Sequence, residues 1–491
     1  MSLLNGNYQI TFTSLAEEPP VAVSATIPAA RRTALAIPVA GIILSLALAV
    51  MLNKGLVFDQ YAQQKWSTSP DSIAITKNAL KADTATVLSW WYGPWVESEM
   101  FYRPLSSMLM WAEARLWGYN FFPYTIVSLV LHALNSALVF LLLYSMCPGP
   151  AWQRALSGLT GALLFNLGHH PEGPYWGYAR VAWGTMIWWP VQTDFGSLLF
   201  SLLSLLLLDR YLLQWQRACR DWAAGDTCRG DEDDSVETCR PRLQSTMLVL
   251  ACASFLMALL FKETPLVIIG IVPFMCLYRW LPWAKVTGAY AAIGVLLFIL
   301  RSLFVPLASN PEWLGVYGFY KLLSYVHYLS AQLLANREVW EFVAMSTLIG
   351  LIFLLRRLRV PVLYTVLAAV AWPFLIAALL SADQNPALVT IPREMLIQLR
   401  LLAVFCGFLI ALVTAGREPA LVFIIGLFAV AVANINRVGP HYWYYPAAMW
   451  GLVDGAVLNA AINLGRSWIG RRQRRPEAGP GVQKVVLSND H

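Results

Sequence analysis

The sequence predicts an all-α, polytopic membrane protein with about twelve transmembrane helices. Hydrophobic residues make up 58% of the chain and charged residues only 13%, whereas charged residues account for roughly 25% of soluble domains. The hydrophobic residues gather in long runs, and a run of about 20 such residues crosses the ~30 Å apolar core of a bilayer as a helix. The basic residues fall in short segments between these runs. The net charge of +7 therefore indicates membrane topology and argues against a nucleic-acid partner.

Residues 1–32 are predicted to form a disordered cytoplasmic tail. They are polar, contain two adjacent prolines and lack the charged start and the cleavage site of a signal peptide. Arg31 and Arg32 directly precede the first apolar run, residues 33–52, and positive residues beside a first span hold that side in the cytoplasm. The loop after this span is therefore expected outside.

The first external loop, residues 53–105, is the longest soluble stretch, and loops of such length are usually functional. Residues 69–71 read Ser-Pro-Asp, which is typical of a helix start. Pro104 disfavours helix at Arg103 but is tolerated in a first helical turn, so Arg103 is expected where an extended segment becomes a helix. From residue 106 to 117 the apolar residues recur at helical spacing, which predicts a helix along the membrane interface. This arrangement places a fixed cation near the membrane surface.

Basic residues lie at nearly every second turn between the predicted spans, and the positive-inside rule therefore orients the whole chain. We expect residues 209–244 to form a charged cytoplasmic loop, residues 305–340 an external loop and residues 466–491 a basic cytoplasmic tail. Both termini are expected in the cytoplasm of a multi-pass protein of the plasma (inner) membrane. The predicted spans are residues 33–52, 124–146, 155–168, 183–208, 246–261, 265–278, 287–304, 341–355, 361–380, 395–415, 419–433 and 443–465.

Asp194 and Lys262 are ionisable residues inside or beside apolar runs, where charges are candidates for function. Asp194 lies about 14 residues from the cytoplasmic end of its span, and Lys262 lies about 16 residues from the cytoplasmic end of the next span. At ~1.5 Å per residue, both residues are ~21–24 Å from the cytoplasmic ends of their helices. Two antiparallel neighbours thus bring opposite charges to similar depth. A structural ion pair and a functional pair both fit this geometry, and Glu263 has no partner in either.

The histidines have structural and functional interpretations. His169, His170 and Glu172 could bind a metal, but adjacent histidines rarely share one ion on a helix, so a place on the surface of an external loop is favoured. His132 and Asn135 lie at i and i+3 on a mostly apolar segment, where a hydrogen bond between helices is the ordinary explanation.

Four short runs, in their order along the chain, resemble GT-C membrane glycosyltransferases. The most similar branch is that of the mannosyltransferase-like proteins that carry tetratricopeptide repeats, and only the membrane part is shared, over most of residues 33–465. Three further positions resemble the family pattern more weakly. They are the pair His170 and Pro171, the residue Asp194, and the aromatic run 442–446. The four runs read LNKGLVFD at 52–59, FYRPL at 101–105, LHALN at 131–135 and FKET at 261–264.

This resemblance implies a GT-C-type fold that moves a sugar from a polyprenyl-phosphate carrier to an acceptor lipid, glycan or protein at the external membrane face, among membrane lipids. It implies that Asp59, at the start of the first external loop, is the base and that Arg103 meets the carrier phosphate. Arginine offers a planar fork of donors for phosphate oxygens, and a carboxylate can take the proton of the acceptor hydroxyl. In this assignment Glu99 joins the catalytic set, Tyr102 and Lys262 join the phosphate site, and Glu263, Asp194, His132 and His170 support the substrate site.

Departures from the family pattern leave alternatives open. Asp59 is followed by Gln60, where family members often have a second acidic residue. A single carboxylate argues against a metal-dependent mechanism, so no cofactor is predicted and a divalent metal is the less favoured alternative. Asp71 is a second candidate base if residues 60–70 are an insertion. Gln60, and the absence of an Arg before Asp194, favour a catalytically inactive subunit of a membrane complex, and a lipid or sugar transporter is a further alternative.

Overall fold

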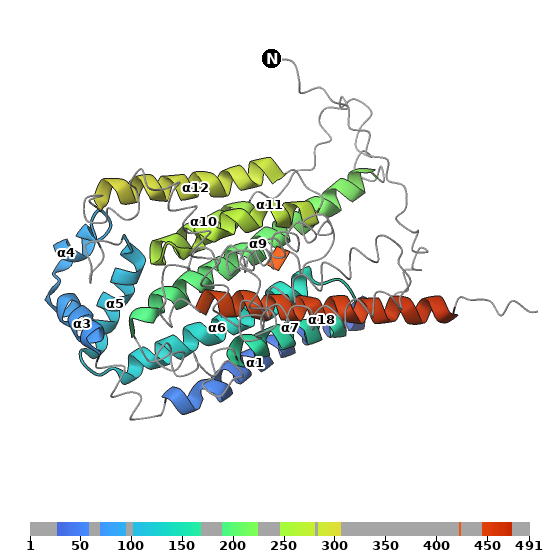
Figure 1. Cartoon of the computed structure of the whole chain (residues 1–491), viewed down its shortest axis with the longest axis horizontal. Coiled ribbons are helices and arrows are strands. Elements are labelled where there is room, and N and C mark those ends of the chain that lie inside the picture. Colours follow the sequence, from blue (N-terminus) through green and yellow to red (C-terminus); the bar gives the residue numbers. More distant parts are fainter. Residues whose placement is uncertain are drawn as a thin grey trace, which may run out of the picture.

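The structure is a computed structural model, and it describes residues 27–57, 69–94, 102–167, 189–223, 246–279, 283–305, 422–423 and 444–473. This part of the chain is built of helices and contains no strand, so the all-α prediction is confirmed for it. The long helices run side by side as a bundle, and α3, α4 and α5 lie together across one end of it (Figure 1). We refer to this end of the bundle as the α5 end.

A helix covers most of each predicted span that the structure describes, but α9 continues past the predicted end at residue 208 to Ala223, and α18 continues past residue 465 to Gln473. The first part of the predicted charged loop 209–244 is therefore helical. The only described residues of the predicted span 419–433 are 422–423, and the spans at 341–355, 361–380 and 395–415 lie outside the described residues. The count of about twelve spans therefore stays a prediction. The bundle consists of α1 (Ile27–Val57), α6 (Phe122–Met146), α7 (Ala151–Leu167), α9 (Gln192–Ala223), α10 (Thr246–Phe261), α11 (Ile268–Tyr278), α12 (Trp283–Phe304) and α18 (Tyr444–Gln473). The shorter elements are α3 (Pro70–Lys81), α4 (Thr84–Ser89), α5 (Pro104–Trp117) and the 3-10 turns η1 (Trp189–Val191) and η2 (Thr264–Val267).

Among the described residues, four helices are long and apolar enough to cross a membrane. They belong to α1, α6, α9 with its preceding η1 turn, and α12, and the apolar helices α10 and α11 are shorter. Helices of this kind are those of a membrane-embedded protein. The four segments are Ala36–Lys54, Phe122–Met146, Trp189–Cys219 and Ala284–Phe304.

The α7 and α18 helices approach each other backbone to backbone. A Cβ atom added at Gly451 would lie 2.5 Å from the carbonyl oxygen of Gly161, and one added at Gly161 would lie 2.7 Å from that of Gly451. Beside this contact, Gln153 Nε2 donates to Asn459 Oδ1 over 2.8 Å. Lipid provides no hydrophobic drive for helices to associate, so close packing of small residues and hydrogen bonds between helices supply much of the attraction here.

The α3–α5 layer has an apolar core of its own. The side chains of Ser69 and Asp83 accept backbone hydrogen bonds and cap α3 and α4. The predicted helix start at residues 69–71 is confirmed, and the segment 106–117 is helical as predicted. The core of the layer consists of Ile75, Ala79, Ala82, Val87, Trp90, Met110, Ala114, Phe121, Tyr124 and Trp189.

A buried carboxyl group, that of Glu113, lies on the inner side of α5. Trp189 Nε1 donates to Glu113 Oε2 over 2.5 Å, whereas Glu113 Oε1 and Gln192 Oε1 are buried without a hydrogen-bond partner. Burial raises the pKa of Glu113 to about 8, although hydrogen bonds with Trp189 and Gln192 act in the opposite direction. The neutral acid is therefore the form that fits the packing.

We expect Gly451→Ala to lower the melting temperature, because the new methyl group would overlap the Gly161 carbonyl oxygen and overpacking costs about 1–3 kcal/mol. Gly288→Ala on α12 is the matched control, since an added Cβ there meets no atom within 4 Å. Thermal unfolding of both variants in detergent measures the difference. An equal loss in the two variants would contradict the contact between α7 and α18.

Glu113→Gln is expected to stabilise the protein at alkaline pH and to remove a pH dependence. The folded-state pKa of about 8 lies above the ordinary value of 4.5, so the stabilisation from the bound proton is complete below pH 4.5 and is lost as the pH rises through about 8. Each unit of difference corresponds to about 1.4 kcal/mol. The measurement is the melting temperature from pH ~5 to ~9.

Asp71→Asn, which changes an exposed carboxylate on α3, is the control for Glu113→Gln and should keep the wild-type pH profile. If Glu113→Gln kept the same downward slope with rising pH, the slope would have another origin.

Candidate functional site

Among the residues that the structure describes, five charged residues from four parts of the chain form a cluster at the α5 end. We define the charged cluster as Arg103, Asp194, Lys262, Glu263 and Arg301. Arg103 precedes α5, Asp194 lies in the first turn of α9, Lys262 and Glu263 follow α10, and Arg301 lies in the last turn of α12. The cluster thus contains three cations and two carboxylates, an excess of one positive charge.

Arg103 occupies the position that the sequence predicts. It is the N-cap residue of α5, and Pro104 is the first residue of the helix. Proline fixes its own φ and has no N–H to leave unsatisfied, so it suits a first helical turn and holds Arg103 outside the helix. The Arg103 side chain is only 7% exposed. The predicted helix start after Arg103 is confirmed.

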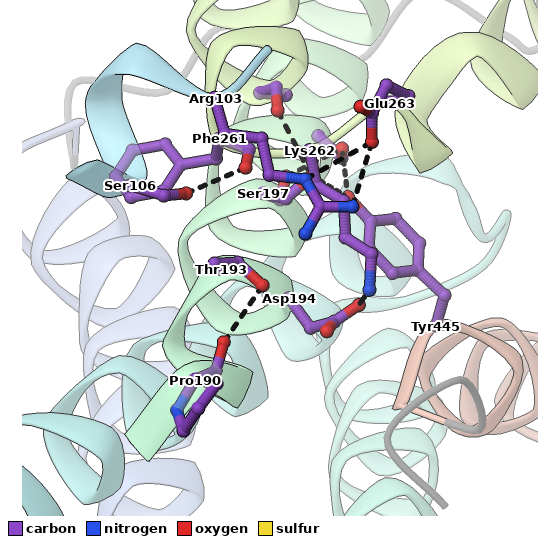
Figure 2. Close-up of polar contacts among 12 residues, drawn as sticks. Arg103, Ser106, Pro190, Thr193, Asp194, Ser197, Phe261, Lys262, Glu263 and Tyr445 are labelled. Atoms are coloured by element: carbon purple, nitrogen blue, oxygen red, sulfur yellow. Dashed lines mark hydrogen bonds and ion pairs between the residues drawn. The ribbon is translucent and has the colours of Figure 1, made fainter. Parts of the chain in front are cut away.

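Lys262 and Glu263 are positioned by the end of α10. In a continuing helix the N–H of residue 265 would bond to the carbonyl of Phe261, but Pro265 has no N–H. The hydroxyl of Ser106, on α5, donates to that carbonyl instead over 2.7 Å. The proline thus ends α10, and the serine joins its last residue to α5 (Figure 2).

The first ion pair of the cluster joins Lys262 to Asp194. Lys262 Nζ lies 2.5 Å from Asp194 Oδ1, and the two side chains are 3% and 4% exposed. The sequence predicts this pairing, because the two residues lie at similar depth on antiparallel neighbours, and the contact is confirmed. A buried charge is tolerated only where it is paired, so each residue stabilises the other in its charged form.

The second ion pair joins Arg103 to Glu263. Arg103 Nη2 and Nε donate to the same atom, Glu263 Oε2, over 3.0 and 3.3 Å, while Oε1 is buried without a hydrogen-bond partner. Arg301 also acts electrostatically on Glu263. Glu263 therefore has a partner, contrary to the sequence-based expectation. Glu97 and Glu99, two carboxylates close to Arg103 in the sequence, lie outside the described residues.

The two ion pairs lie next to each other (Figure 2), and Arg103 and Glu263 both act electrostatically on Lys262. Tyr102 lies at the edge of the cluster. Its hydroxyl donates to the Trp91 carbonyl over 2.9 Å, and its ring lies 5.9 Å from that of Phe304 on α12. The predicted phosphate-site residues Arg103, Tyr102 and Lys262 are thus brought to one end of the bundle.

His132 belongs to a second polar network deeper in the bundle. Asn166 donates through its amide nitrogen to Ser136, so its Oδ1 accepts from His132 Nε2 over 2.8 Å. His132 Nδ1 then accepts from the Tyr444 hydroxyl at 3.0 Å, and Asn135 donates to the same hydroxyl. The predicted hydrogen bond between helices is confirmed, and it joins α6, α7 and α18.

The remaining predicted site residues are not brought into the charged cluster by the described structure. Asp71 is exposed in the first turn of α3. Asp59, Glu99 and His170 lie outside the described residues, so their roles stay predictions. No group of three or more His, Cys, Asp or Glu side chains suited to a metal ion occurs within the ranges that the structure describes.

The sequence-based prediction missed Arg301 and Glu113. A signal for Arg301 was present, because a basic residue at the end of an apolar run is unusual on the side that the positive-inside rule assigns to the exterior. Comparison of the chain with protein-family models, with curated proteins and with solved structures gives no match. We therefore infer the function from the residues of the site.

We expect Lys262→Met to destabilise the protein by about 3–5 kcal/mol, because it leaves the buried Asp194 carboxylate without its partner. Adding Asp194→Asn should restore most of the loss. Lys81→Met, which removes an exposed lysine from α3, should have little effect. Melting temperatures of the four proteins test this, and a double variant as unstable as Lys262→Met alone would contradict the pairing.

Proposed function

We propose that this protein is a GT-C-type membrane glycosyltransferase that moves a sugar from a polyprenyl-phosphate carrier to a lipid, glycan or protein acceptor at the external membrane face. The charged cluster is the observation that carries the proposal. It has an excess of positive charge, it is largely buried, and it lies at the end of the bundle covered by the α3–α5 layer.

The carrier phosphate is the leaving group of such a transfer, so it gains negative charge as the bond to the sugar breaks. Cations already placed beside the leaving oxygen stabilise this charge without reorganisation. In this proposal Arg103 is the phosphate-binding residue, since its guanidinium has a fork of donors and keeps its charge when poorly hydrated. Its Nε and Nη2 already converge on one carboxylate oxygen of Glu263, and a phosphate oxygen is an acceptor of the same kind.

The acceptor hydroxyl must lose a proton as its oxygen bonds to the sugar. A carboxylate can take this proton while the electron pair of the broken bond leaves with the phosphate oxygen, an effect worth about 10²–10⁴ in rate. We assign the base to Asp59, with Asp71 as the alternative. Direct displacement of the phosphate by the acceptor inverts the configuration of the sugar.

A non-catalytic subunit of a membrane complex is the second candidate. It is favoured by the mutual pairing of Arg103 with Glu263 and of Lys262 with Asp194, which needs no ligand. In that case the cluster would serve only to hold α5, α9 and α10 together, and Gln60 beside Asp59 would reflect a lost active site.

We expect Arg103→Ala to lower sugar transfer by about 10²–10³ and to weaken binding of a polyprenyl monophosphate. Arg103→Lys keeps the charge but loses the fork, so it should fall between wild type and Arg103→Ala. Transfer is measured with lipid-linked sugars in nanodiscs, and binding is measured with the phosphate and with the matched polyprenol that lacks it.

The double variant Arg103→Ala with Glu263→Gln separates the two candidates. If lipid-phosphate binding were unchanged in Arg103→Ala and thermal stability recovered in the double variant, Arg103 would be structural. Asp59→Asn and Asp71→Asn distinguish the two bases, because the amide keeps the shape of the carboxylate but cannot take the proton. Loss of transfer in Asp59→Asn only would support Asp59, and full activity in both variants would show that neither carboxylate is the base. Absence of transfer by the wild-type protein would favour the non-catalytic subunit.

A further inference from the structure

A cavity of about 260 Å³ lies at the end of the bundle opposite the charged cluster. Its wall is formed by the turn between α6 and α7, the second half of α9 and the end of α11. Arg210 in this wall follows Asp194 by 16 residues on the same helix, which corresponds to ~24 Å along the axis. The cavity is therefore separate from the proposed active site. Its lining includes Arg154, Arg210, Arg217 and Arg279.

The charge of this arginine pocket is positive and largely uncompensated. Among the residues that the structure describes, no Asp or Glu lines the cavity. Asp209 lies behind the wall, where it binds Arg279 Nη2 at 2.6 Å and accepts from the Ser145 hydroxyl at 2.5 Å. Within the part of the chain that the structure describes, Arg154, Arg210 and Arg217 have no ion-pair partner.

The pocket is already shaped in the absence of a ligand. The guanidinium of Arg154 lies 4.5 Å above the Tyr144 ring, and its Nε atom is buried without a hydrogen-bond partner. Asp209 and the Tyr278 ring, 4.8 Å away, hold Arg279. The turn that closes one side reads Pro-Gly-Pro at 148–150, and Gly149 has a φ of +118° that only glycine adopts readily. Arg154 and Arg279 would therefore lose little conformational freedom on binding, which favours affinity.

The pocket lies where a bilayer surface is expected. Arg210 follows the first residue of α9 by 18 positions, which is ~27 Å along a helix, close to the ~30 Å thickness of the hydrocarbon core. The positive-inside rule assigns this end of the bundle to the cytoplasm. Phosphates of anionic lipids lie at this depth, and basic pockets between transmembrane helices on that side bind such head groups.

We propose that the arginine pocket binds a phosphate group presented by an anionic lipid of the inner leaflet. Arginine forks match phosphate oxygens in pairs, and Arg210 and Arg217 are exposed lining residues that have no ion-pair partner among the described residues. A bound lipid would bridge the α6–α7 turn, α9 and α11. This inference does not depend on the proposed enzymatic function.

The test compares phosphatidylglycerol with phosphatidylcholine, added to the detergent-purified full chain, by native mass spectrometry and melting temperature. Phosphatidylglycerol is expected to bind more tightly and to raise the melting temperature more. Arg210→Gln with Arg217→Gln changes two exposed residues, so the fold should be kept, and affinity for phosphatidylglycerol should fall about 10- to 30-fold. Arg466→Ala is the control, since Arg466 is basic and binds Gln153 but does not line the pocket.

Three results would overturn the proposal. Equal binding of the two lipids to the wild type would show that charge is not recognised. Stabilisation by inorganic phosphate as large as that by phosphatidylglycerol would identify a soluble anion as the ligand. Preferential binding that emerges only after the acidic residues 231–234 are changed to Asn and Gln would identify that segment, which lies outside the described residues, as the natural occupant.

Discussion

The buried contact between Lys262 and Asp194 is the interaction on which the α5 end depends. The ammonium group of a lysine that is 3% exposed lies 2.5 Å from a carboxylate, and a buried charge is tolerated only where it is paired. The pair joins the end of α10 to the start of α9 and so determines where the next residue, Glu263, lies. Glu263 in turn binds Arg103 at the start of α5. The α3–α5 layer is therefore attached to the bundle through charges as well as through its apolar core.

The two carboxylates of the charged cluster have a role even if the site binds a phosphate. Three cations gathered in a poorly hydrated region would repel one another strongly, because charges interact more strongly at low dielectric. Asp194 and Glu263 lower this repulsion when no anion is bound. A phosphate-binding function and a structural function thus require the same resting geometry, and variants that change one charge at a time distinguish them.

Local sequence patterns, together with the depth of residues along their helices, predicted much of the fold and part of the site. Apolar runs located the helices, Pro104 located the start of α5, and distance along the two helices brought Asp194 and Lys262 to the same level. The Arg103–Glu263 pair was not predicted, because its members are 160 residues apart and their contact depends on which helices are neighbours. Spacing along one chain carries no such information.

The arginine pocket was not predicted from the sequence for the same reason. In the sequence, Arg154 and Arg279 are ordinary positive-inside residues in separate turns, and that role fully accounts for their positions. Only the packing of α6, α7, α9 and α11 shows that they line one cavity. Asp209, placed midway along α9, gives no sign in the sequence that it compensates Arg279.

The place of Tyr444 in the His132 network has a consequence for the order of assembly. Tyr444 follows His132 by 312 residues, so α6 and α7 are synthesised long before the hydroxyl that completes their hydrogen bonds. Unsatisfied polar groups are costly in a membrane. Until α18 is inserted, His132 Nδ1 lacks the Tyr444 hydroxyl as its donor, although His132 Nε2 can already pair with Asn166 and Asn135 with the Phe195 carbonyl. Chains that end before Tyr444 would therefore retain unsatisfied polar groups within the membrane, which cellular quality control can recognise.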